Sequence, residues 1–193
     1  MLLLGVLVGA CGRAAADRTG NARTARVGMV DPVLSLDPRA ARFVSEADVA
    51  TQGFDGLVET TPSGEVIGTL AHRWEWLDEG RRLRVHLKQG TRWHDGRTLR
   101  ADEVVASLRA ALDDSTVATA NDELVEMLAG KARDGEVPGG RRALLERIQA
   151  VDDSTLDLRI QPGDSTRIAA FGGTGWLVQR PGPAGSGPIG TGR

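Results

Sequence analysis

The chain has 193 residues, of which 40% are hydrophobic, and this is enough to bury one ordinary core or two small cores that share an interface. Its 26 acidic and 24 basic residues are spread along the whole length and give a formal net charge of -2, so no basic face predicts nucleic-acid binding. A single cysteine excludes an internal disulfide and a metal site built from several thiolates.

The first residues form a short apolar run that ends in small residues just before Cys11. A helix of this length is too short to span a bilayer, so the run predicts an export signal peptide over residues 1–10. The sequence VGAC, Val8 to Cys11, resembles a bacterial lipobox, in which the cysteine is acylated and becomes the mature N-terminus. We therefore expect lipidation at Cys11 and attachment to the membrane through a lipid anchor. The alternative is the buried start of a cytoplasmic helix. Signal peptides carry Lys or Arg before the apolar run, and this sequence has neither there.

The next segments predict a tether, a strand and a helical region. Residues 11–25 are small and polar without an apolar period, which is typical of a flexible tether. The apolar run 25–30 has strand length, and two prolines at 32 and 38 prevent it from continuing. From Arg39 to Val58 the apolar residues follow steps of three and four, which predicts a helix or a pair of helices.

An antiparallel hairpin is predicted from the alternation of residues 73–88. A Pro-Ser-Gly turn at 62–64, between two extended pieces, precedes it, and its own turn falls at 78–80. Every second residue is apolar, and these residues form one face: Trp74, Trp76, Leu83, Val85 and Leu87. The residues between them are charged or histidine and form the other face: Arg73, Glu75, Arg82, Arg84, His86 and Lys88. One face of this hairpin is therefore expected to meet solvent.

Three helices and a second hairpin follow. Thr98 or Asp102 is a candidate helix start, and the expected buried stripe of that helix is Val104, Val105, Leu108 and Leu112. Further helices are predicted at 121–132 and 141–148, and a hairpin over 149–162 turns at 152–154. Residues 172–193 are too rich in Gly and Pro for a regular element, except at 176–179, where Trp176 is a candidate for contact with a ligand or another domain.

Catalytic and metal-binding chemistry receives little support from the histidines, which are His72, His86 and His94. Their spacing does not match a helical pair of metal ligands, so we expect no metal site. His94 and Asp95 could form a base with its orienting carboxylate, but adjacent residues of an extended chain point to opposite faces. The favoured interpretation is a turn, in which Asp95 accepts backbone bonds and Gly96 takes the left-handed conformation.

The order of these segments resembles the extracellular solute-binding proteins of ABC transporters in the oligopeptide, dipeptide and nickel class. The matching motifs run from residue 26 to 193 and are SLDP at 35–38, FDGLVET at 54–60, TLAHRWEW at 69–76, LRVHLKQGTRWHDGRTLRADEVVASLRAAL at 83–112, VDDSTLDLRI at 151–160 and PIGTGR at 188–193. In that family the His-Asp-Gly turn is structural. Trp93 stands here where the family pattern has Phe.

The resemblance implies a mixed α/β fold of the class II periplasmic-binding-protein type. It places the start of the first lobe at 26–72, a small subdomain at 73–165 and a Gly/Pro-rich connection at 166–193. Family members are more than twice as long, so we expect a truncation before the second lobe and feeble binding by this chain alone. By position, the residues that line the cleft would be Arg42, Phe43 and Val44, and Arg42 could equally be a solvent-facing arginine.

The implied function is capture of a peptide or small polar solute outside the cell and delivery to an ABC permease in the membrane. The family uses no bond-making chemistry, so neither an enzyme activity nor a cofactor is expected. Two alternatives are a single lobe that serves as a surface scaffold for a protein partner, and a secreted hydrolase that uses His94 and Asp95.

Overall fold

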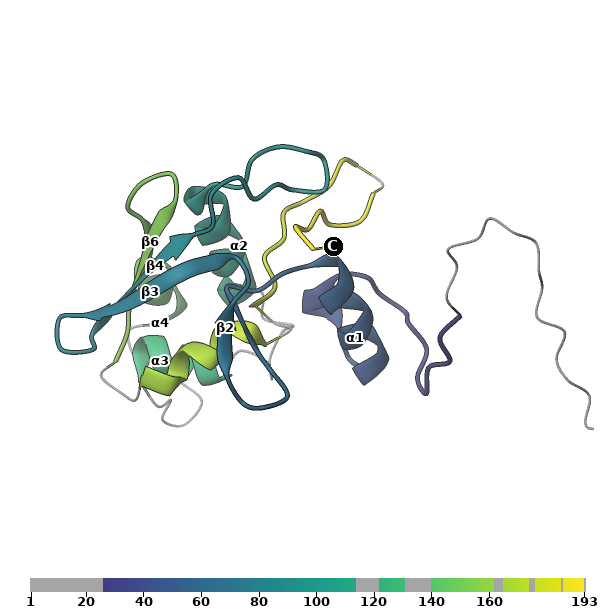
Figure 1. Cartoon of the computed structure of the whole chain (residues 1–193), viewed down its shortest axis with the longest axis horizontal. Helices are drawn as coiled ribbons and strands as arrows, with labels where there is room; N and C mark the ends of the chain where they lie inside the picture. Colours follow the sequence, from purple (N-terminus) through teal and green to yellow (C-terminus); the bar gives the residue numbers. More distant parts are fainter. Residues whose placement is uncertain are drawn as a thin grey trace, which may run out of the picture.

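The computed structural model describes residues 26–113, 122–130, 140–161, 165–173, 176–184 and 186–192. The expected signal peptide, the tether and Cys11 lie outside these residues. A four-stranded sheet with helices against it forms the larger part, and helix α1 (Val44–Gly53) lies at one side with the hairpin of β1 (Val58–Thr60) and β2 (Val66–Gly68) next to it, as Figure 1 shows. No helix among the described residues is both long and apolar enough to cross a bilayer.

The larger sheet has the strand order β3-β4-β6-β5, and every neighbouring pair is antiparallel. Its strands are β3 (Ala71–Leu77), β4 (Arg82–Leu87), β5 (Ile148–Ala150) and β6 (Thr155–Arg159). The register pairs Trp74 with Val85 and Trp76 with Leu83, so the two predicted hairpins and the predicted apolar face are confirmed. The β3–β4 turn is tight because Asp78, Glu79 and Gly80 all have positive φ angles.

The core lies between this sheet and three helices. These are α2 (Ala101–Asp113), α3 (Asp122–Ala129) and α4 (Gly140–Leu145). The predicted stripe of α2 is buried as expected, and α2 packs against β5 and β6. Fully buried residues such as Leu83, Leu108 and Leu158 belong to one cluster, which also includes Phe171 and Trp176. Burying each such side chain contributes about 1.5–3 kcal/mol, so this shared core holds the sheet and helices together.

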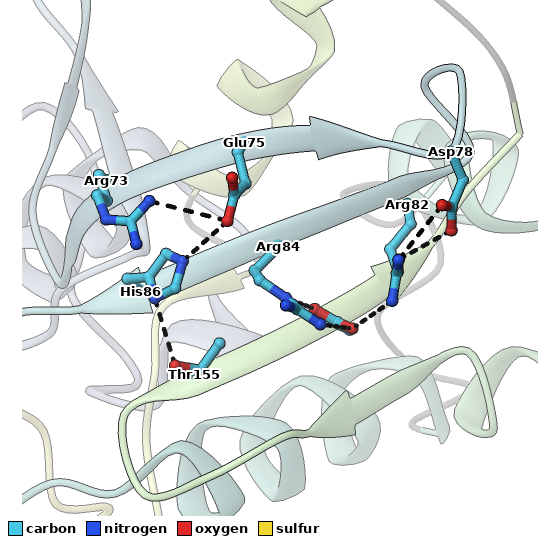
Figure 2. Close-up of polar contacts among 8 residues, drawn as sticks. Arg73, Glu75, Asp78, Arg82, Arg84, His86 and Thr155 are labelled. Carbon is cyan, nitrogen blue, oxygen red and sulfur yellow. Dashed lines mark hydrogen bonds and ion pairs between the residues drawn. The ribbon is translucent and has the colours of Figure 1, made fainter.

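The opposite face of the sheet carries the charged side chains, as Figure 2 shows. Arg84 donates two hydrogen bonds to Asp157, at 2.7 and 2.8 Å, and Arg82 forms an ion pair with the same carboxylate at 3.3 Å. These contacts, led by the hydrogen bonds from Arg84, hold the pKa of Asp157 below its usual value against the opposing effect of burial. The Asp157 side chain is only 14% exposed, so its charge is screened less than that of a surface carboxylate.

The N-terminal part of the chain differs from the sequence prediction. Residues 26–30 form no strand, because none of the described strands pairs with them, and Val30 is 98% exposed. The predicted helical region divides into the 3₁₀ turn η1 (Pro38–Ala40) and α1. It divides because Asp37 caps η1 by accepting the Arg39 N–H at 2.9 Å, and the chain becomes extended again before α1 begins.

Helix starts and the C-terminal segment also required correction. Helix α2 begins at Ala101, and neither Thr98 nor Asp102 is its first residue. Glu103 accepts the Arg100 N–H at 3.1 Å, and Asp102 accepts the Glu103 N–H at 3.1 Å. The third predicted helix ends at Leu145 instead of 148. A 3₁₀ segment that the sequence did not predict, η2 (Ser165–Gly172), packs against β1 and α3.

Candidate functional site

The predicted cleft residues Arg42, Phe43 and Val44 lie together where η1 leads into α1. All three are exposed, with Phe43 38% and Val44 71% exposed. The Arg42 guanidinium makes no hydrogen bond or ion pair with the described residues. The segment therefore presents one cation and two apolar side chains to solvent.

Glu46 fixes the backbone that carries these side chains. Its carboxylate is buried, at 2% exposure, and accepts N–H groups from both sides of η1. Oε2 accepts from Arg42 at 2.6 Å and Phe43 at 3.2 Å, and Oε1 accepts from Leu34 at 2.9 Å and Ser35 at 3.0 Å. The bond from Arg42, helped by the other three, lowers the pKa of Glu46 although burial raises it. Glu46 is thus an ionised carboxylate that holds the segment 34–46 in one conformation.

Sequence reasoning did not identify Glu46, although a signal was present. Glu46 lies three residues after Phe43, which is the spacing of a capping box, in which a side chain at the third helical position accepts the N–H of the capping residue. Because the helical period was traced from Arg39, Glu46 was placed inside the helix and not at its start.

The C-terminal segment ties this region to the rest of the fold. The Gln179 amide nitrogen donates to Asp37 Oδ1 at 2.9 Å, and the Gln179 N–H donates to the Ser107 hydroxyl at 2.9 Å. Gly192 donates its N–H to the Gly53 carbonyl at 3.2 Å. The C-terminal segment therefore links η1 and the C-terminal end of α1 to helix α2, and Figure 1 shows this segment running beside α1.

His94 and Asp95 do not form a catalytic pair. The His94 ring nitrogen Nε2 lies 2.8 Å from the Gly192 carbonyl oxygen, whereas Asp95 accepts the Arg97 N–H at 3.2 Å and pairs with Arg180. Burial raises the pKa of Asp95, but the bonds from Arg97 and Arg180 outweigh it and keep the pKa below its usual value. Gly96 has a φ of 85°, so the predicted structural turn is confirmed.

The other candidate side chains have structural surroundings. His72 is exposed, and His86 Nε2 lies 3.2 Å from Glu75, so the two rings do not converge on a common centre. Within the described residues, no group of three His, Cys, Asp or Glu side chains could hold a metal ion. Trp176 is 2% exposed and belongs to the core, so it does not meet a ligand there.

A cavity of about 270 Å³ lies at the end of α1 opposite to Arg42. Its lining includes Gln52, Asp55, Glu59 and Leu177. The structure therefore places the predicted cleft residues together on an exposed edge, outside this cavity.

The comparison with protein families identifies the family of this chain. The model of bacterial extracellular solute-binding proteins, family 5 Middle, matches residues 65–192. The chain belongs to this family. The match includes the β3–β4 hairpin, the 93–97 turn and α2, which carry the resemblance noted in the sequence.

Individual relatives agree with the family match. Over 127 residues, this family 5 chain is 31% identical to the probable deoxycholate-binding periplasmic protein YgiS of Escherichia coli, with coverage of 66% of this chain and 24% of that protein. The solved structure of the murein tripeptide-binding protein MppA of Escherichia coli gives a TM-score of 0.63 at 22% identity, with 82% of this chain and 32% of that chain covered. Listeria monocytogenes OppA bound to peptide gives 0.62 at 24% identity, with 75% and 28% covered.

These structures show a shared fold. The predicted mixed α/β fold of the periplasmic-binding-protein type is therefore confirmed. The chain spans about a quarter to a third of the length of these relatives.

Proposed function

We propose that this protein captures a peptide or a similar small polar solute outside the cell and delivers it to an ABC permease in the membrane. The observation that carries the proposal is the family match over residues 65–192. Relatives named for peptide binding and for deoxycholate binding share the fold or the sequence, so the solute is proposed as a class and not as one compound. Capture and release need no bond-making chemistry, and no enzyme activity is part of the proposal.

Within this function, Arg42, Phe43 and Val44 are proposed to contact the solute. Arg42 has an exposed guanidinium without a partner among the described residues, and a guanidinium binds a carboxylate with two parallel hydrogen bonds. Phe43 and Val44 offer apolar surface beside it. Because Glu46 already holds the backbone of this segment, little conformational entropy is lost when a solute binds there.

The proposed location is the outer face of the membrane, with a lipid anchor at Cys11. The support is the VGAC sequence after an apolar run, together with the extracellular character of the family. A Cys11→Ser variant tests the anchor. We expect the wild-type protein in the membrane fraction with the mass of an acylated N-terminus, and the variant without that mass. An unmodified Cys11 in membrane-associated protein would disprove the anchor.

Uptake by intact cells tests the transport function. A strain that lacks the gene is expected to take up isotope-labelled peptides more slowly than the parent strain, and a plasmid copy is expected to restore uptake. A plasmid copy with Arg42→Ala should restore less uptake, because the guanidinium that pairs with the carboxylate of the solute is lost. The matched control is Arg92→Ala, which removes an exposed arginine from the 92–98 turn. Equal uptake by the deletion and parent strains, for peptides and other small polar solutes alike, would refute the proposal.

A further inference from the structure

A second surface, at the end of the sheet that carries the β3–β4 turn, concentrates positive charge. Here the β3–β4 turn, the end of β6 and the segment before β5 enclose an open groove of about 480 Å³. Four arginines and one aspartate belong to its lining: Arg81, Arg82, Arg147, Arg159 and Asp78. Because the whole chain has a net charge of -2, this excess of arginine is a local feature.

The strand register brings three of these arginines into one row. Arg82 of β4 lies directly opposite Arg159 of β6, and Arg159 donates its N–H to the carbonyl of Arg147 at 2.8 Å. Like charges directly opposite each other destabilise a sheet. Such a conflict between local preference and structure is expected where a surface has a binding role.

Among the described residues, carboxylates pair with only one arginine of the row. Arg82 is paired with Asp78 at 2.9 Å and with Asp157 at 3.3 Å, and Asp157 is also occupied by Arg84. Arg147 instead donates to the carbonyl of Leu128 at 2.7 Å, which satisfies one bond at the end of α3 and leaves its charge in place.

The side chains of Arg81 and Arg159 make no hydrogen bond or ion pair with any residue that the structure describes. Three guanidinium charges, on Arg81, Arg147 and Arg159, therefore face the groove without a carboxylate partner among the described residues. Gln161 adds an amide to the same wall.

We propose that this groove binds an oxyanion of the phosphate type. A guanidinium presents N–H groups in a fixed fork that matches the oxygens of a carboxylate or a phosphate. A carboxylate has only two oxygens, whereas a phosphate group offers three acceptor oxygens and up to two negative charges, which suits three guanidiniums that have no carboxylate partner among the described residues. The groove volume lies within the usual range of small-molecule sites, so a phosphate can enter with the group that carries it. Free or small-molecule phosphate and a phospholipid headgroup supply the same chemistry.

The first experiment follows the arginine side-chain N–H signals by NMR while inorganic phosphate is added to the 193-residue chain. Phosphate is expected to shift the Arg81, Arg147 and Arg159 signals in a saturable way that weakens as sodium chloride is raised. Arg159→Gln and Arg81→Gln should each weaken binding by about tenfold, the loss expected when one charged hydrogen-bond partner is removed.

The matched control is Arg73→Gln, which removes the same charge from the other end of the same sheet face, where Arg73 pairs with Glu75. Phosphate binding by this variant should equal that of the wild type. Circular dichroism of all three variants checks that the fold is kept. If phosphate shifts no arginine signal saturably, or if Arg73→Gln weakens binding as much as Arg159→Gln does, the groove is not a site and the proposal is overturned.

A second arm separates the two sources of phosphate. Vesicles of phosphatidylglycerol and of phosphatidylcholine are mixed with the same proteins and floated on a density gradient. Binding to phosphatidylglycerol that falls in Arg81→Gln and Arg159→Gln, and not in Arg73→Gln, assigns the site to a lipid headgroup. If phosphate binds saturably but the arginine variants bind phosphatidylglycerol vesicles as the wild type does, the site is assigned to free or small-molecule phosphate.

Discussion

Replacing Trp93 by Phe tests how the family turn is joined to helix α2. The Trp93 side chain is 2% exposed, and its indole Nε1 donates to Glu103 Oε2 at 2.8 Å. The Arg180 guanidinium carbon lies 5.4 Å from the centre of the indole ring. Phe keeps an aromatic ring for this contact but cannot donate the hydrogen bond. Glu103 would keep its bonds from Arg97 and from the Arg100 N–H.

The expected loss in the free energy of unfolding is about 2–3 kcal/mol. Hydrogen bonds to charged groups contribute about 1.5–3 kcal/mol, and the smaller ring of Phe adds a modest loss of buried apolar surface. Urea unfolding followed by circular dichroism should therefore show a midpoint about 1 M lower, for a urea dependence of about 2 kcal/mol per M.

Trp76→Phe is the matched control, because Trp76 is only half-buried and its indole has no acceptor among the described residues. It should lower the midpoint much less. The variant Glu103→Ala and the double variant with Trp93→Phe complete a double-mutant cycle. Additive effects in this cycle, or equal losses for the two tryptophan variants, would refute the conclusion that the indole bond joins the turn to α2.

Three further predictions concern other parts of the chain. At neutral pH, Asp157→Asn should lower the free energy of unfolding by about 1–3 kcal/mol, because the arginine partners of Asp157 lose the negative charge with which they pair. The pKa of Asp157 is lowered by folding, so its contribution is present above the unfolded-state pKa and disappears as pH falls through the folded-state pKa; an Asn variant equally destabilised in acid would contradict this. Glu46→Gln should speed amide hydrogen exchange in segment 34–46, because the NH₂ group of Gln cannot accept the backbone hydrogen bonds that a carboxylate oxygen accepts. The control Glu65→Gln, at an exposed position, should leave this exchange unchanged. Unchanged exchange in Glu46→Gln would show that the carboxylate does not hold the segment. Gly190→Ala places a methyl group against the end of α1, so limited proteolysis should cut the C-terminal segment faster in this variant than in Gly187→Ala. In Gly187→Ala the added carbon meets nothing within 4 Å. Equal cleavage rates in the two variants would contradict the close packing at Gly190.

The regular alternation of residues was the part of the fold that the sequence predicted best. In the hairpin of β3 and β4 every second residue is apolar, and burying one face of a sheet requires that period, so strands, turn and face could all be deduced. The stripe of α2 was predictable for the same reason, at the helical period.

The elements that were missed depend on contacts between distant residues. Trp176 lies in a Gly/Pro-rich segment without a period, and only packing against the core buries it. The run at 26–30 has strand composition, but a strand exists only where another strand supplies hydrogen bonds. Glu46 accepts backbone N–H groups as far away in the sequence as Leu34, and in this way it organises the segment that carries Arg42. A pattern of residue types does not predict that Leu34 and Glu46 lie close together.

The proposed capture of a solute outside the cell is tested most directly by photo-crosslinking in intact cells. Cells that produce the protein are exposed to a photoreactive peptide that does not cross the membrane unaided, and the labelled proteins are identified by mass spectrometry. We predict that this protein is labelled, that an excess of unlabelled peptide or small polar solute suppresses the label, and that Arg42→Ala reduces it. A protein that is made and exported but is labelled neither by the peptide nor by similarly reactive small polar solutes would contradict the proposed function.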